Sequence, residues 1–155
     1  MVAPSDAELY GKHAEELTRF ATGLVGPQDA PDVVSAAVLA CIFSKGWPRV
    51  ENPRAYLFRG VLNEARRLHR ATSRRLVREQ RAALPSAVDP PDVRPEILAA
   101  VMELSIRQRA VTVLTYWSDL DPSSVALLLG ISEGSVRRHL ARARSRLKER
   151  LDDNA

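Results

Sequence analysis

Residues 121–140 read Asp-Pro-Ser-Ser-Val-Ala-Leu-Leu-Leu-Gly-Ile-Ser-Glu-Gly-Ser-Val-Arg-Arg-His-Leu, and this stretch decides the fold. Asp121 is a favourable N-cap residue, and Pro122 suits the first position of a helix, where a missing N–H costs little. Gly130 can adopt the left-handed conformation that ends a helix, and Ser132 can cap the next one. The stretch therefore predicts two helices joined by a tight turn, which is a helix-turn-helix.

The second of these helices is predicted to be apolar on one side and cationic on the other. Its apolar residues are Val136, Leu140, Ala143, Leu147 and Leu151. The opposite side combines small residues, which permit close approach, with arginines, which can pair with phosphates or with guanine edges. An ordinary solvated basic face is the alternative, but the position in a helix-turn-helix favours DNA contact. The candidate DNA-binding residues of this helix are Glu133, Ser135, Arg137, Arg138, His139 and Arg142.

The composition is that of a globular protein, with 45% apolar and 27% charged residues in a chain of 155. The net charge of +4 is unevenly distributed, because residues 59–81 and 137–150 hold most of the excess arginine. Two separated basic segments indicate two contacts with a polyanion. Cys41 is the single cysteine and is expected to be a buried apolar residue, so no internal disulfide is expected. No membrane span or secretory signal is evident, so the expected location is cytoplasmic.

A second cationic stripe is predicted on the helix that starts after the cap Asn52-Pro53. Leu57, Val61 and Leu68 lie on its inward side. The outward side carries arginines, an asparagine and a tyrosine, which suit a nucleic-acid backbone with unstacked bases, although a solvated face is an equal alternative. The candidate residues are Tyr56, Arg59, Asn63, Arg66, Arg67 and Arg70.

The fold class is predicted to be all-α, because no segment shows the alternation typical of a strand. Capping boxes at Ser5–Glu8 and Ser105–Gln108 start two helices, and a buried helix is predicted from Val33 to about Lys45. Three prolines within residues 79–94 and a fourth directly after them, with neighbouring aspartates, make residues 79–94 a linker. The chain is thus expected to have two small helical domains, residues 1–78 and residues 95–155.

No residues form a pattern that predicts catalysis. The sequence lacks a glycine-rich phosphate loop, a nucleophile elbow and a His-Glu-x-x-His motif. The pairs Asp29 with Asp32 and Asp119 with Asp121 lie where helix starts and a turn are expected. We therefore expect neither enzymatic activity nor a cofactor nor a bound metal.

In these features the chain resembles the bacterial RNA polymerase sigma factors of the extracytoplasmic-function type. Residues 104–117, 125–132 and 142–147 are similar to the family's fourth conserved region, which reads the upstream promoter element in the major groove. Residues 53–63 are similar to the part of the second region that engages and opens the downstream element, and Asn63 matches a characteristic asparagine there.

The resemblance also implies that the chain binds the polymerase core. Residues 29–34 look like the start of the polymerase-binding helix, which makes Asp32, Val33, Val34 and Ser35 the candidate contacts. The family usually continues with a polar pair and a large aromatic residue, whereas Ser35, Ala36, Ala37 and Val38 follow here. The family further suggests control by an anti-sigma partner.

Two other functions remain open from the sequence. The altered segment after Val34 favours a sigma-like DNA-binding regulator that does not dock on polymerase. A protein-interaction adaptor, whose basic faces are solvated or meet acidic proteins, is the other alternative.

Overall fold

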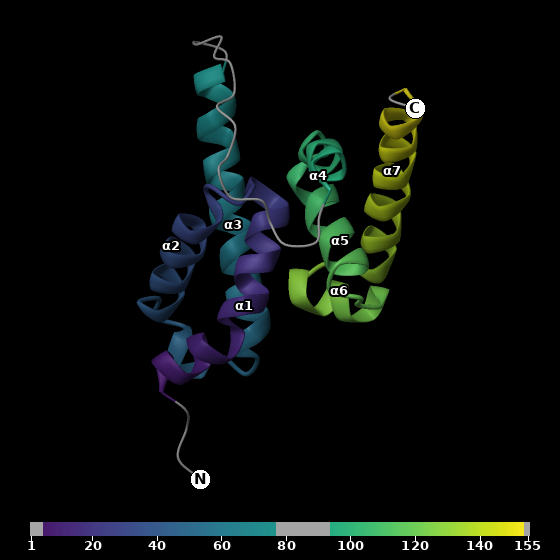
Figure 1. The fold of residues 1–155 in the computed structure, drawn as a ribbon. Coiled ribbons are helices and arrows are strands. Elements are labelled where there is room, and N and C mark those ends of the chain that lie inside the picture. Colours follow the sequence, from purple (N-terminus) through teal and green to yellow (C-terminus); the bar gives the residue numbers. More distant parts are fainter. Residues whose placement is uncertain (1–4, 77–93, 154–155) are drawn as a thin grey trace.

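The computed structural model describes residues 5–76 and 94–153. These residues form seven α-helices and one short 3-10 helix, with no strand among them, which confirms the all-α prediction (Figure 1). The helices are α1 (Asp6–Val25), α2 (Ala30–Ile42), η1 (Trp47–Arg49), α3 (Pro53–Leu76), α4 (Pro95–Met102), α5 (Ile106–Tyr116), α6 (Pro122–Leu129) and α7 (Glu133–Asp152).

The predicted helix starts are formed by the side chains that the sequence indicated. The Ser5 hydroxyl accepts from the Glu8 backbone N–H, and the Glu8 carboxylate accepts from the Ser5 N–H. The same reciprocal pair joins Ser105 and Gln108 at the start of α5. Each box satisfies two N–H groups that the first turn of a helix leaves without partners.

Three observed helix boundaries, two in α2 and one in α4, differ from the prediction. α2 begins at Ala30 rather than Val33, because Pro31 lies in its first turn, where a proline is compatible with the helix. It ends at Ile42 rather than Lys45, and the Ser44 hydroxyl then donates to the Cys41 carbonyl oxygen. α4 ends at Met102 instead of Leu104.

Helices α1, α2 and α3 pack into one group around buried aromatic and aliphatic side chains. The rings of Phe20 and Phe58 lie 5.0 Å apart between α1 and α3. α2 approaches α3 closely at Gly60, where a Cβ atom would lie 2.5 Å from Cys41 Sγ. Cys41 is therefore buried as predicted, and its burial raises the pKa of the thiol.

Helices α4 to α7 form the second group, which contains the helix-turn-helix. The Asp121 carboxylate caps α6 through the Ser124 N–H, and Gly130 ends α6 in the left-handed region, with φ of 67°. The Ser132 hydroxyl then caps α7 through the Ser135 N–H. On α7 the predicted apolar side holds at Val136, Leu140 and Ala143, which are buried, whereas Leu151 near the end is 40% exposed.

The two groups contact each other directly, α1 with α5 and α3 with α6 (Figure 1). The sequence did not predict this contact. The linker assigned to residues 79–94 lies outside the described residues apart from Arg94, and the division into two domains remains a prediction. Within the described residues, no helix is long and apolar enough to span a membrane.

Candidate nucleic-acid and polymerase interfaces

The outward face of α7 is held in place by the turn that precedes it. Capping by Ser132 fixes the start of the helix, and burial of Val136 and Leu140 fixes its rotation. The predicted DNA-binding residues consequently lie on the uncovered side. The four charged ones, Glu133, Arg137, Arg138 and Arg142, are exposed. The other two, Ser135 and His139, are half-buried.

Two arginines of this face are oriented by neighbours on α7 itself. Arg137 lies 3.5 Å from the Glu133 carboxylate one turn earlier, and Arg138 donates to the Ser135 hydroxyl at 3.1 Å. Both contacts are exposed, so both side chains can exchange them for a phosphate or a base edge at little cost. The first turn of α7 thus presents preoriented cations.

His139 lies on the same helix in a cationic environment. Partial burial lowers the pKa of its imidazole, and the positive charges of Arg107, Arg142 and Arg138 lower it further. Its Nδ1 atom is buried and has no hydrogen-bond partner among the described residues. His139 is therefore uncharged near neutral pH, and its half-buried ring contributes shape rather than charge to the face.

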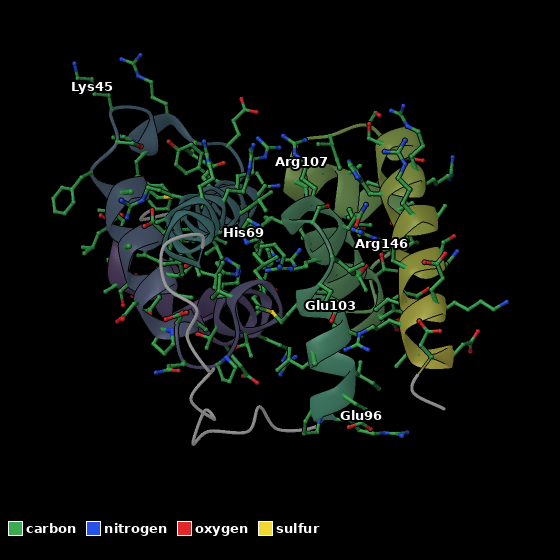
Figure 2. All side chains as sticks on the ribbon, turned by 90° about the horizontal axis from the view of Figure 1, so that it is seen from above. Lys45, His69, Glu96, Glu103, Arg107 and Arg146 are labelled. Atoms are coloured by element: carbon green, nitrogen blue, oxygen red, sulfur yellow. The ribbon has the colours of Figure 1, made fainter. Side chains whose placement is uncertain are left out.

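The predicted stripe on α3 is brought together only in part. Arg59, Asn63 and Arg66 line one side of a cavity of about 240 Å³, and Arg107 lines it from the start of α5. The Arg107 side chain is labelled in Figure 2. The remaining lining residues are Leu62, Leu129, Gly130 and Ile131. Among the described residues, no carboxylate forms an ion pair with these three arginines. Sequence reasoning missed Arg107, because a single arginine after a capping box has no distinguishing pattern.

The other three candidates on α3 lie outside this cavity. The Tyr56 hydroxyl is hydrogen-bonded to the Ser44 hydroxyl at 2.8 Å, and its ring lies 5.8 Å from that of Trp47. Arg67 pairs with Glu64 on its own helix. Arg70 donates to the Arg66 carbonyl oxygen at 3.5 Å. Tyr56 thus belongs to a small structural cluster, whereas both arginines extend the stripe along α3.

The predicted polymerase contacts on α2 divide between two faces. Asp32 and Ser35 are exposed, but Val33 and Val34 are 4% and 1% exposed and pack in the core. These two valines position α2 and present little surface to a partner.

The exposed side of α2 carries two large apolar residues that the sequence analysis did not select. Leu39 is 55% exposed and Phe43, one turn later, is 81% exposed. Neighbouring exposed apolar side chains mark contact sites on protein surfaces. Their spacing of four residues in the predicted helix was the signal that could have identified them.

Comparisons with known proteins cover both helical groups. Residues 94–147 match the family model described as Sigma-70, region 4. The RNA polymerase sigma-E factor of Streptomyces antibioticus is 32% identical over 154 residues, covering 94% of this chain and 83% of that protein. The chain belongs to the RNA polymerase sigma factors, of the extracytoplasmic-function type. The Streptomyces coelicolor sigma-E factor is 31% identical over 93% of the chain and 84% of that relative.

Two solved structures, the first of them a sigma factor, share the fold. RpoE of Bartonella quintana, in complex with the anti-sigma factor NepR, aligns with a TM-score of 0.70 at 24% identity, over 92% of this chain and 94% of that one. CnrH, in complex with the cytosolic domain of CnrY, aligns with a TM-score of 0.64 at 25% identity, over 97% and 89% of the two chains. Sigma factors are non-catalytic initiation factors, and the alternatives of a regulator or an adaptor are not favoured.

Proposed function

We propose that this sigma factor directs RNA polymerase core to specific promoters and helps to open them. The observation that carries the proposal is the outward face of α7, where Arg137, Arg138 and Arg142 follow a capped turn inside the region that matches sigma region 4. In this proposal α7 enters the major groove of the upstream element. An arginine paired with guanine there contributes about 1–3 kcal/mol of discrimination.

The α3 stripe is proposed to act on the downstream element. Asn63, Arg66 and Arg70 would hold the non-template strand as its bases leave the stack. Arg59 Nη2 now donates to the Leu127 carbonyl oxygen on α6 at 2.9 Å, and Arg59 would join the other three when it leaves that oxygen. Unstacking costs a few kcal/mol per step, so backbone contacts and captured bases must offset it. Because one chain carries both surfaces, the second DNA contact is effectively intramolecular once the first is made.

Docking on the polymerase core is assigned to the exposed side of α2. Asp32 and Ser35 supply polar contacts at its start, and Leu39 with Phe43 supplies apolar area near its end. Burial of apolar area stabilises an interface by about 25 cal/mol per Å². Leu39 and Phe43 can thus supply the apolar contact that the family usually makes with a large aromatic residue after Val34, which this chain lacks.

The remaining proposals follow from the family. The protein has no enzymatic activity of its own and acts in the cytoplasm with promoter DNA and the polymerase core. An anti-sigma factor is a further proposed partner, because the solved RpoE of Bartonella quintana is in complex with the anti-sigma factor NepR.

A core-binding experiment tests the docking surface. Leu39→Glu is expected to abolish co-purification with polymerase core, whereas Ala40→Glu, at the exposed neighbouring position on α2, retains it. Leu127→Glu is a second control, because Leu127 is 59% exposed on α6. Failure of the unmodified protein to bind core would favour the alternative of a DNA-binding regulator.

A further inference from the structure

The cavity between α3, the start of α5 and the turn of the helix-turn-helix combines cationic and apolar walls. Of its three arginines, Arg59 and Arg107 are exposed and Arg66 is half-buried. The apolar part of the lining includes Leu62 and Leu129, which are 8% and 7% exposed. A cleft with charges of one sign and apolar walls focuses the electric field inside it. The cavity therefore attracts anions more strongly than a flat basic surface does.

The positive charge of the cavity is not neutralised by the residues that the structure describes. Neither Arg66 nor Arg107 forms an ion pair or a side-chain hydrogen bond with another described residue. Arg59 donates to a neutral acceptor, the Leu127 carbonyl oxygen. None of the described residues that line the cavity is acidic. Because like charges at close range repel, an anion that enters between these arginines relieves the repulsion.

The size of the cavity limits the ligand to a small anion. Its volume is about 240 Å³. One water molecule takes up about 30 Å³ in the liquid, so the cavity has room for a ligand with the bulk of about eight waters. This is slightly below the range of about 300 to 1,000 Å³ for pockets that hold drug-sized ligands. A single-strand site, in contrast, holds about four or more nucleotides, which this cavity cannot enclose.

The charge and the donor groups of the cavity favour two linked phosphate groups. The planar fork of a guanidinium matches the oxygens of a phosphate. One phosphate group carries a charge of about −1.5 to −2 near pH 7, which is too little for three arginines. Arg59 has five N–H donors, so it can bind a phosphate oxygen and keep its hydrogen bond to Leu127. The Asn63 amide is a further donor in the lining.

We propose that this cavity is a binding site for a diphosphate group, either inorganic pyrophosphate or the diphosphate of a nucleotide. Arg59, Arg66 and the Asn63 amide bind it from α3, and Arg107 binds it from α5. No described residue of the lining is aromatic, so the base of a nucleotide has no ring to stack on and adds little affinity. A bound diphosphate would compete with single-stranded DNA for the α3 residues, and this consequence alone rests on the proposed role of α3.

Isothermal titration calorimetry on the full chain tests the site directly. Pyrophosphate, ADP, inorganic phosphate and sulfate are compared at equal ionic strength in a buffer without divalent cations. Pyrophosphate is expected to bind with one site per chain, and ADP with an affinity within about threefold of it. Phosphate and sulfate should bind at least tenfold more weakly, because they lack the second anionic group and its hydrogen bonds. Pyrophosphate should also raise the melting temperature, since it binds the folded state.

Two arginine variants separate the cavity from general charge attraction. Arg107→Met removes one cation of the cavity at an exposed position outside the α3 stripe. Arg49→Met is the matched control, because it makes the same change at an exposed arginine of η1 that does not line the cavity. Arg107→Met should weaken pyrophosphate binding about tenfold or more, since a hydrogen bond between charged groups contributes at least this factor. Arg49→Met should bind like the unmodified chain.

The inference is overturned if pyrophosphate does not bind, if it binds no more tightly than sulfate, or if both variants lose the same affinity. Binding of ADP without binding of pyrophosphate would also overturn it, because the nucleoside would then carry the recognition.

Competition with DNA is measured separately by fluorescence anisotropy of a short labelled single strand. Pyrophosphate should displace the strand at concentrations where sulfate does not, and equal displacement by both anions would contradict the competition. If the unmodified chain binds no DNA, the proposed role of α3 fails, whereas the calorimetry still decides the diphosphate site.

Discussion

Arg109 on α5 donates a 2.7 Å hydrogen bond from Nη1 to the Leu24 carbonyl oxygen at the end of α1. The same guanidinium donates to the carbonyl oxygens of Leu104 and Met102, and the residue is only 5% exposed. Burial lowers the pKa of this arginine. Among residues 5–76 and 94–153 no carboxylate pairs with this buried cation, which is held by three backbone oxygens, two between α4 and α5 and one at the end of α1.

Arg109→Met is expected to destabilise the protein by about 3 kcal/mol, because it leaves buried carbonyl oxygens without donors. Chemical denaturation followed by circular dichroism measures the loss. Arg107→Met is the control, since Arg107 is exposed on the same turn of α5 and its replacement should stay within about 0.5 kcal/mol. Equal stabilities of the two variants would contradict the assigned role of Arg109.

Ser132→Ala is expected to cost about 1 kcal/mol by removing the N-cap of α7. The loss should also weaken DNA binding, because the cap fixes the first turn of the proposed recognition helix. Ser145→Ala, an exposed position farther along α7, should change neither thermal unfolding nor DNA affinity. An unchanged melting temperature for Ser132→Ala would show that the cap does not set the start of α7.

Protonation of Glu16 is expected to destabilise the fold at acidic pH. Burial of its carboxyl raises the pKa, but hydrogen bonds and charge from Arg54 and His13 outweigh burial and leave the pKa below the ordinary value of 4.5. The network's contribution is therefore complete above about pH 4.5 and is lost as the pH falls through the lower folded-state pKa. Unfolding measured from pH 7 to pH 3 should show Glu16→Gln less stable at neutral pH, with the difference narrowing in acid. A constant difference would contradict the network.

His139 is expected to act in a higher pH range. Its folded-state pKa lies below the ordinary value of 6.5, so the neutral ring favours the folded state, and stability is lost as the pH falls below 6.5. His139→Gln cannot take up this proton. Its stability should therefore fall less than that of the unmodified protein between pH 7 and pH 5.5. Urea unfolding at several pH values measures the free energy of unfolding of both proteins. The same decrease of this free energy with pH in both would contradict the assignment.

The cationic face of α7 predicts a salt-dependent loss of DNA binding. Arg142→Ala should weaken binding to promoter DNA about tenfold or more and reduce the dependence of log affinity on log salt by about one phosphate contact. Arg144→Ala is the matched control on the same helix. Arg144 donates to the Tyr116 hydroxyl at 2.6 Å and lies 5.8 Å from its ring, which orients it toward α5 rather than the outward face. Equal losses for both variants would indicate attraction by net charge alone.

Local signals in the chain predicted most of the helices. Ser5, Ser105, Asp121 and Ser132 each cap the helix that they were expected to start, and Gly130 takes the left-handed conformation. These features depend on a few neighbouring residues, so they can be read in order along the chain. The helix ends were less well predicted, because Pro31 and Phe43 are compatible with more than one boundary.

The contact between the two groups could not be predicted in the same way. In the sequence, Gly23 is only a residue that weakens a helix. Its role becomes evident in the structure, where Val113, ninety positions later, packs against it. Arg109 resembles a surface arginine until the Leu24 oxygen is placed beside it. The candidate sites were likewise selected by helical position, which did not reveal that Val33 and Val34 are buried or that Arg59 is engaged by α6.

Promoter opening by the reconstituted holoenzyme tests the central claim most directly. Unmodified protein, polymerase core and promoter DNA would be mixed, and unpaired thymines in the downstream element would be detected with permanganate. The account predicts thymine reactivity that depends on the sigma factor. This reactivity should be lost with Leu39→Glu, because that protein does not bind the core. It should be reduced with Asn63→Ala, although that protein still binds the core. A holoenzyme that forms but leaves the promoter fully paired, or an Asn63→Ala protein that opens it as well as the unmodified chain, would contradict the account.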